Sequence, residues 1–307
     1  MNTEQFRNFA VAYRTHNFSA AARAIPMSAQ GFTKSIRTLE NELGVPLFVR
    51  DEATGSHVPT AYADEFIAYV NAVESQYQSV KKAFRHIQAE ENGNVLLGSS
   101  LGIIGFLGRS FFEGFESDNP GITLHYTEMN DIQCDEHLLE EDFGLAFSLA
   151  PYHCDFETVE LYSTPVCLWV NEEDELGKKE VISLSDLDGR SLAMPGVGFK
   201  CYSNILDRCR VQGVTPKTVL QSSEMFWLYN FAYEGRGLAF SAEHLGQLPF
   251  FSERGVRCIP LEGVTWRFGI SSLPKHRFTE PERLFRKYCI EYFSGLSKGG
   301  SDARQHF

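Results

Sequence analysis

Four polar side chains in the segment 28–44 could act together chemically: Gln30, Thr33, Lys34 and Arg37. On a helix they fall on one side, where they present an amide, a hydroxyl and two cations but no carboxylate. Amides and hydroxyls read the edges of base pairs in a DNA major groove, and cations also bind phosphates. The pattern favours a DNA-reading helix about as much as an ordinary solvated helix face.

The elements that must position these side chains are one helix and its neighbours. Ser28 can cap the helix by accepting a hydrogen bond from an exposed amide of the first turn. Gly44 stands where a left-handed residue commonly ends a helix. Between them an apolar stripe recurs at helical spacing, formed by Phe32, Ile36, Leu39 and Leu43. Together with the preceding segment from Asn17, the stripe predicts two helices joined by a tight turn.

A longer sequence pattern decides between these two interpretations of the polar face. In order and spacing, the chain resembles the N-terminal pattern of the LysR-type transcriptional regulators at Phe6, Phe9, Ala22, Leu39, Glu40, Leu43, Gly44, Leu47, Phe48, Arg50 and Thr60. It departs from that pattern at Ala29, at Ala63, and at Asp51 and Glu52, which follow Arg50 where the wing is usually basic. The departures concern the operator sequence and the wing rather than the family.

The resemblance implies a winged helix-turn-helix over residues 1–60 that binds duplex DNA as its operator. The first helix is expected over residues 3–15 with Thr3 as its cap, and Ser19 is expected to cap the second helix. Residues 46–60 would form the wing, with Gly55 at the tip of its hairpin. Arg50 would meet backbone phosphate. The expected DNA-binding residues are Ser28, Gln30, Thr33, Lys34, Arg37 and Arg50.

Residues 61–88 carry a heptad pattern. Apolar residues alternate spacings of four and three, at Phe66, Val70, Val73, Tyr77, Val80, Phe84 and Ile87. This period lets two helices supercoil around each other, so we expect the segment to dimerise the protein through Phe66, Val70, Val73, Tyr77, Val80 and Phe84. The resemblance implies a linker helix that pairs antiparallel in a homodimer or homotetramer.

Beyond a polar hinge at residues 89–94, strand-like runs alternate with helical patterns, which favours βαβ units. The expected fold class is α/β overall, and the order resembles the two-lobed, periplasmic-binding-protein-like effector-binding domain of the same family. That domain would span residues 94–293, with lobe one at 94–161 and 268–293 and lobe two at 165–266. The expected helices are Ile104–Phe115, Ser203–Gln212, Glu224–Tyr233 and Glu280–Phe293. Residues 294–307, rich in glycine and serine, are expected to form a disordered tail.

Ligands of open α/β sheets bind at the carboxyl ends of strands, close to helix N-termini. Three loops meet this rule, and hydroxyls or free amides in them would favour an anion. The expected effector is therefore a small organic acid, with Phe199, Tyr202, Phe226 and Trp227 as an apolar wall. Ordinary helix capping is the alternative for the serines. The expected effector-binding residues are Ser99, Ser100, Pro195, Phe199, Tyr202, Ser222 and Ser223.

The net charge of the 307-residue chain is −12, yet its first 50 residues hold six cations against three carboxylates, a net of +3. A modest local surplus predicts modest phosphate contact by this segment. No apolar run is nearly long enough to span a membrane, and the N-terminus lacks the basic-then-apolar pattern of a signal peptide. A cytoplasmic protein without membrane contact is therefore expected. No motif of an enzyme and no metal-ligand set is found, which predicts no catalytic residues, no metal and no cofactor.

Two alternatives stay open. One is a redox-sensing regulator of the LysR type that uses Cys201 and Cys209, although two helical turns would hold these residues ~12 Å apart. The other is a cytoplasmic solute-binding protein, because the fold of residues 94–293 would be shared. For a regulator, the implied partners are duplex DNA, a small-molecule effector, further copies of the chain and RNA polymerase.

Overall fold

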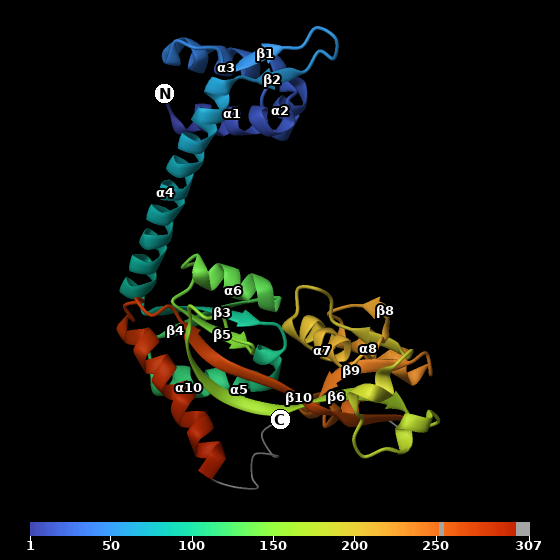
Figure 1. The fold of residues 1–307 in the computed structure, drawn as a ribbon. Coiled ribbons are helices and arrows are strands. Elements are labelled where there is room, and N and C mark those ends of the chain that lie inside the picture. Colours follow the sequence, from blue (N-terminus) through green and yellow to red (C-terminus); the bar gives the residue numbers. More distant parts are fainter. Residues whose placement is uncertain (252–254, 299–307) are drawn as a thin grey trace. The chain divides into compact units, whose positions relative to one another are not determined.

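The computed structural model describes residues 1–251 and 255–298. The chain folds as two compact units that divide between Arg85 and His86. Figure 1 shows the N-terminal unit in blue and the second unit in green to red. Within the described ranges, no helix is both long and apolar enough to cross a membrane.

The N-terminal unit is a winged helix. Its elements are α1 (Thr3–Thr15), α2 (Phe18–Ala24), α3 (Ala29–Leu43), the antiparallel strands β1 (Phe48–Arg50) and β2 (His57–Pro59), and the first part of α4 (Ala61–Glu91). The three short helices enclose a core in which Phe9, Phe32 and Leu39 are completely buried. The expected winged helix-turn-helix is confirmed.

The helix caps show where the local sequence pattern was sufficient to predict the ends of a helix. Ser28 Oγ accepts a hydrogen bond from the Gly31 amide at 3.1 Å, and Gly44 ends α3 with φ of 74°, both as expected. The predictions of two other N-caps are wrong. Asn2, not Thr3, caps α1 in a reciprocal pairing with Gln5. Asn17, not Ser19, caps α2, because its side chain accepts the Ala20 amide at 3.0 Å.

The turn of the wing explains the acidic residue that departs from the family pattern. Asp51 accepts hydrogen bonds from the amides of Ala53 at 2.8 Å and Thr54 at 3.1 Å. Those amides hold the pKa of the Asp51 carboxyl below its usual value. Gly55 lies at the tip with φ of 69°, a conformation that suits glycine. Asp51 therefore builds the hairpin that presents Arg50.

The heptad seam of α4 divides into two parts. Val70 is only 3% exposed and, with Phe66, packs into the core of the winged helix. The later seam residues are about half exposed: Tyr77, Val80, Phe84 and Ile87. Val70 is therefore occupied within its own unit, which corrects the expectation that it pairs with another copy.

The second unit is built on an eight-stranded mixed sheet with the order β4-β3-β5-β10-β6-β9-β7-β8. Its strands are β3 (Asn94–Ser100), β4 (Thr123–Met129), β5 (Leu145–Leu149), β6 (Glu157–Asn171), β7 (Ser191–Met194), β8 (Lys217–Gln221), β9 (Leu238–Ala242) and β10 (Val256–Ser272). Its α-helices are α5 (Ile103–Asp118), α6 (Asp131–Leu139), α7 (Lys200–Val211), α8 (Met225–Tyr233), α9 (Glu243–Gly246) and α10 (Glu280–Lys298). The expected α/β class is confirmed.

Two long antiparallel strands connect the lobes. β6 and β10 pair along most of their length, with a register shift between Pro260 and Thr265, and Figure 1 shows both curving from one lobe into the other. Parallel pairs lie outside them: β3 with β4 and β5, and β7 with β8 and β9. The lobes therefore share one sheet, and each keeps a parallel part whose carboxyl ends can face a ligand.

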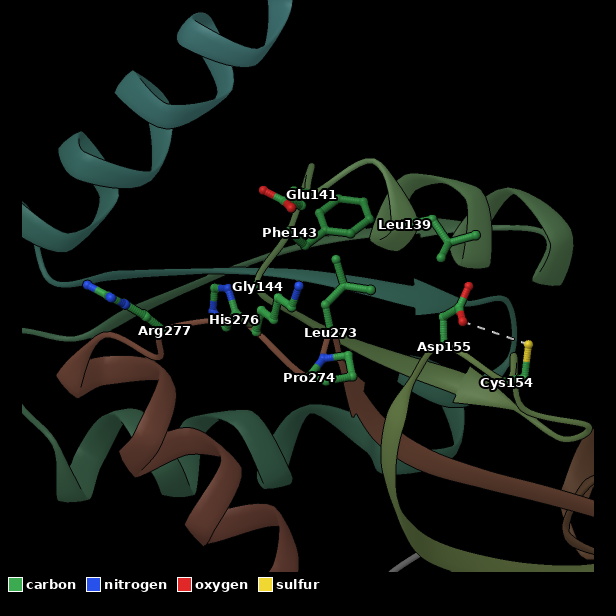
Figure 2. A pocket seen from close by; sticks show the side chains of 11 residues that line it. Leu139, Glu141, Phe143, Gly144, Cys154, Asp155, Leu273, Pro274, His276 and Arg277 are labelled. Carbon is green, nitrogen blue, oxygen red and sulfur yellow. Dashed lines mark hydrogen bonds between the residues drawn. The ribbon is translucent and has the colours of Figure 1, made fainter.

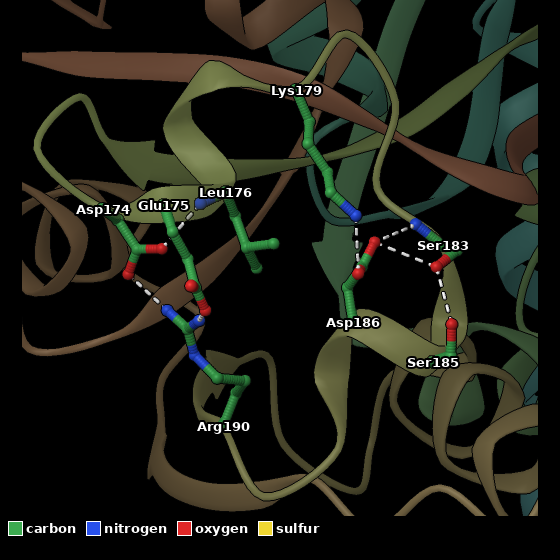
Figure 3. Close-up of polar contacts among 8 residues, drawn as sticks. All are labelled: Asp174, Glu175, Leu176, Lys179, Ser183, Ser185, Asp186 and Arg190. Carbon is green, nitrogen blue, oxygen red and sulfur yellow. Dashed lines mark hydrogen bonds and ion pairs between the residues drawn. The ribbon is translucent and has the colours of Figure 1, made fainter.

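The connection from β6 to β7 holds two short 3₁₀ turns, Glu175–Lys178 and Leu184–Leu187. Figure 3 shows the contacts that fix them: Arg190 pairs with Asp174 and Glu175, while Lys179 lies 2.6 Å from Asp186 Oδ1. At the far end of the unit, α10 runs through Lys298. The expected disordered tail is therefore wrong for residues 294–298, and its remainder, 299–307, lies outside the described residues.

Candidate nucleic-acid interface and ligand pocket

The polar face of α3 is presented as the sequence predicts. Gln30, Lys34 and Arg37 are exposed and Thr33 is half-buried, while the stripe on the opposite face packs into the core. A shallow hollow runs along this face, lined by Ala29, Gln30, Thr33, Lys34, Arg37, Thr38 and Asn41. Its lining contains two cations and no carboxylate, so the face can accept phosphates and the edges of bases.

Buried polar contacts fix the position of α3. Asn8 of α1 donates to Ser35 Oγ at 2.9 Å, which ties the two helices together. Glu40 Oε1 accepts the amides of Leu47 at 2.7 Å and Phe48 at 3.1 Å, so the end of α3 sets the start of the wing. The Glu40 carboxylate is therefore engaged with the chain and does not face the hollow on α3.

The wing is held at its base by an aromatic stack. His57 of β2 lies flat on Phe18, with ring centroids 3.6 Å apart and planes 8° from parallel. Burial, with the positive charge of Arg50 beside it, lowers the pKa of His57. The ring is therefore neutral near pH 7, and Arg50, exposed opposite it at the end of β1, is the cation that this wing offers to phosphate.

A second site lies between the lobes, at the carboxyl ends of β3, β5 and β7. Its cavity of about 160 Å³ has mostly apolar walls. The lining residues are Leu101, Gly102, Asp131, Leu149, Pro195, Phe199, Cys201, Ser223, Met225, Phe240, Ala242, His244, Leu245 and Trp266. This is the location at which α/β sheets bind small molecules.

The structure brings Pro195, Phe199 and Ser223 to this cavity. Four other expected effector residues do not line it. Ser99 and Ser100 are fully buried; Ser99 donates to the Ser100 carbonyl oxygen at 3.0 Å. Tyr202 accepts from Gln221 at 3.3 Å, and Ser222 caps the next turn by accepting the Glu224 amide at 3.1 Å.

The expected aromatic wall is wrong for Phe226 and Trp227. These side chains are 53% and 58% exposed and line a separate hollow on α8. The wall of the cavity includes Trp266, and its polar lining includes Asp131 and His244, three residues that were not expected there from the sequence. A signal was present for Asp131, because it follows the carboxyl end of a strand just as the selected serines do.

A buried polar cluster joins the two lobes beside the cavity. Lys200 Nζ of α7 lies 2.7 Å from Asp135 Oδ2 of α6 and donates to the Leu149 carbonyl oxygen at 2.7 Å. The Lys200 amide donates to Asp131 Oδ2 at 2.8 Å, and the Ile132 amide donates to the Gly198 carbonyl oxygen at 3.1 Å. These contacts hold the first turn of α7 against the first turns of α6.

Burial sets the charges around the cavity. It raises the pKa of Asp131 to about 6 and also raises the pKa of Asp135, whereas it lowers the pKa of His244 to about 4. At neutral pH Asp131 is mainly ionised and His244 is neutral. The buried cluster therefore contains two carboxyl groups and a single lysine, Lys200.

A larger hollow of about 630 Å³ lies in lobe one. It is lined by Leu139, Glu141, Phe143, Gly144, Cys154, Asp155, Leu273, Pro274, Lys275, His276 and Arg277. Figure 2 shows Cys154 and Asp155 at one side and His276 and Arg277 at the other. Gly144 immediately precedes β5, so this hollow lies at the amino end of that strand, away from the edge where α/β sheets bind ligands.

The support for a metal site and for redox-active cysteines is weaker than that for the interlobe cavity. Two surface groups within the described ranges bring three donor atoms within 4.8 Å of one another: His153, Cys154 and Asp155, and His137, Glu140 and Asp142. The expectation of no bound metal stays a prediction. Burial raises the pKa of both Cys201 and Cys209, which keeps them as thiols and disfavours the redox alternative.

Comparisons with known proteins match both units of the chain. The family model described as "Bacterial regulatory helix-turn-helix protein, lysR family" matches residues 3–64, and the one described as "LysR substrate binding domain" matches residues 90–294. An uncharacterized HTH-type transcriptional regulator of Bacillus subtilis, YybE, is 23% identical, over 96% of this chain and all of its own.

Solved structures share the fold. HinK, a LysR family transcriptional regulator from Pseudomonas aeruginosa, superposes with a TM-score of 0.56 at 17% identity, over 96% of this chain and 99% of its own. Full-length CbnR complexed with its target DNA superposes with a TM-score of 0.51 at 16% identity, over 96% of this chain and all of its own.

Proposed function

The chain belongs to the LysR family of bacterial transcriptional regulators, and from this premise we propose which of its residues read DNA and where its effector binds. Members of this family are regulators rather than enzymes, and the second unit is the effector-binding domain. In our proposal residues 1–60 bind the operator, residues 61–88 pair two copies, and residues 94–293 bind the effector between lobe one and lobe two.

One observation carries the DNA-binding proposal. The exposed face of α3 presents Gln30, Thr33, Lys34 and Arg37 without a carboxylate, while its opposite face is locked into the core. Gln30, Thr33 and Lys34 would meet base edges, and Arg37 with Arg50 of the wing would meet phosphates. Ser28 acts through its cap, because it fixes the first turn of this helix.

The exposed part of α4 supports dimerisation. Val80, Phe84 and Ile87 lie on one stripe and are each about half exposed, although large apolar residues at heptad spacing normally pack against something. Pairing two copies along this stripe would cover it and bring two recognition helices to one operator. A homodimer or homotetramer is the expected assembly, and regulation of transcription implies RNA polymerase as a further partner.

We place the effector in the interlobe cavity. The last turns of α4 belong to the second unit, where His86 Nε2 lies 2.9 Å from the Glu141 carbonyl oxygen and Ala89 is buried. A ligand that favours one arrangement of the lobes would therefore shift the element that carries the recognition helix. Its influence is limited to the difference between its affinities for the two arrangements. An organic acid is the class that the sequence favours for this effector.

Selection of duplexes from a random library by the full-length chain, followed by DNase I footprinting of the enriched sequence, tests the proposal. We expect a two-fold related motif protected over more than one helical turn. Enrichment of no sequence, or binding that depends on salt but not on sequence, would show that α3 grips phosphates without reading bases.

A further inference from the structure

Helices α5, α7 and α8 begin beside the cavity, and a carboxylate of this chain lies at the N-terminus of α5 and of α7. Gly102 lines the cavity and precedes α5, and its amide lies close enough to the exposed Glu128 side chain to lower that carboxyl's pKa, against a larger rise caused by burial. Because the N-terminus of a helix attracts negative charge, an acidic ligand would normally bind at such a position. Here Glu128 occupies it.

The same holds for α7. Its first amide, that of Lys200, donates to Asp131 Oδ2 at 2.8 Å, so this N-terminus is also occupied by an internal carboxylate. The remaining cation of the region is engaged, because Lys200 Nζ is bound by Asp135 and the Leu149 carbonyl oxygen. An incoming carboxylate would meet Asp131 at the first amide of this helix and an ammonium group that is already paired.

The third N-terminus, that of α8, is different. Glu224 is its N-cap residue but makes no side-chain hydrogen bond to the helix, and its exposed side chain lines the separate hollow on α8. Among the residues that line the interlobe cavity, Asp131 is the one carboxylate. In a low-dielectric setting, its repulsion of an acidic ligand would be strong.

Asp131 supplies an independent sign that the site takes a ligand. It is completely buried, and although the Ser100 hydroxyl lies close enough to stabilise the carboxylate, neither Asp131 Oδ1 nor Ser100 Oγ makes a well-formed hydrogen bond within the described chain. Buried polar atoms are rarely left unpaired without a reason. Asp131 also lines the cavity, so it is the group to which a donor on the ligand would be attracted.

We infer that the effector is a small amine with an apolar body rather than an organic acid. This inference rests on the proposed function, because it assigns a chemical class to the effector of the interlobe cavity. The protonated amine faces Asp131, and the apolar body packs against Phe199, Phe240 and Trp266, whose ring faces also attract a cation. The cavity of about 160 Å³ is small for a ligand site, so the effector is small.

Three compounds that share one apolar part and differ in charge test the chemical class of the effector. Phenethylamine, 2-phenylethanol and 3-phenylpropionate share a phenyl ring on a short chain and differ in a cationic, neutral or anionic end. Isothermal titration into the full-length protein should show the amine binding about tenfold or more tighter than the acid. Tighter binding of the acid, or failure of phenethylamine and other small aryl amines to bind at millimolar concentration, overturns the inference.

Variants test whether Asp131 causes the preference for the amine. Asp131→Asn keeps the shape and an acceptor for the Lys200 amide but removes the charge, so the preference for amine over acid should fall by about tenfold. Glu113→Gln, an exposed carboxylate of α5 that pairs with Arg109, is the matched control and should change nothing. An unchanged preference in Asp131→Asn, with an unaltered melting temperature, contradicts the role of Asp131.

The outcome is separable from the proposed function, because DNA binding is measured without ligand. Sequence-specific DNA binding with preference for the acid would overturn only the assignment of the effector class. Amine binding by a protein that recognises no DNA sequence would instead overturn the regulatory proposal and leave the chemistry of the cavity intact.

Discussion

Lys200 Nζ lies 2.7 Å from Asp135 Oδ2, and this ion pair joins the first residue of α7 in lobe two to α6 in lobe one. Both side chains are almost completely buried, at 8% and 11% exposed. A buried pair of this kind is costly to break from one side, because the remaining charge loses its partner. The contact therefore joins lobe one and lobe two in the interior of the second unit.

Lys200→Met should destabilise the second unit by about 3–5 kcal/mol, because it leaves Asp131 and Asp135 without their cation. All three tryptophans of the chain, Trp169, Trp227 and Trp266, lie in this unit, so urea unfolding followed by tryptophan fluorescence reports it selectively.

The double variant Lys200→Met with Asp135→Leu should recover part of that loss, since no unpaired Asp135 charge remains. Arg283→Met removes an exposed pair with Glu280 and should cost less than about 1 kcal/mol. Equal losses in Lys200→Met and Arg283→Met would show that the interlobe pair stabilises nothing.

Val80→Asp with Phe84→Asp should convert the protein to monomers, because pairing along the exposed stripe of α4 would bury two unpaired charges. Analytical ultracentrifugation measures the change. Val70→Ala is the control, since Val70 packs inside its own unit and its truncation should lower stability without altering the assembly. A dimer that survives both charges would place the interface elsewhere.

Asp131 makes the stability of the second unit depend on pH. Burial raises its pKa to about 6, so between about pH 4 and pH 6 the folded protein holds a proton that the unfolded chain has released. The free energy of unfolding therefore falls as pH rises through this window, by about 3 kcal/mol in total.

The groups that face Asp131 are Lys200 of α7, Asp135 of α6 and Ser100 of β3. They are the same in Asp131→Asn, so the difference between the two proteins isolates this carboxyl. Urea unfolding from about pH 4 to pH 7 should show the wild type losing stability relative to the variant as pH rises. Parallel curves would mean that Asp131 titrates normally.

Local pattern was sufficient where one residue type fits one position. Ser28 and Gly44 mark the ends of α3 by chemistry that does not depend on the rest of the fold. It failed where two residues fit equally well. Asn17 and Ser19 are both good caps, and only the path of the chain decides that Asn17 accepts the amide.

Long-range packing decided what the sequence could not. Val70 and Phe84 follow the same heptad pattern, but only Val70 meets the core of the winged helix. Lysine is normally exposed, and Lys200 is buried because Asp135 and the Leu149 carbonyl oxygen, both distant in the sequence, bind its ammonium group. The α6 helix that carries Asp131 was not among the expected helices, so the acidic partner of the cavity was missed.

The central claim is that α3 reads base sequence through Gln30 and Thr33, and the most direct test is the affinity of the full-length protein for its selected operator and for scrambled duplexes, measured by fluorescence anisotropy. Gln30→Ala and Thr33→Ala should each reduce the preference for the operator by about 1–3 kcal/mol, while Arg50→Ala weakens binding to all duplexes alike. Ser79→Ala, which removes an exposed hydroxyl from α4 outside this face, is the matched control and should change neither affinity nor preference. If Gln30→Ala and Thr33→Ala leave affinity and preference unchanged, α3 does not read the operator with this face.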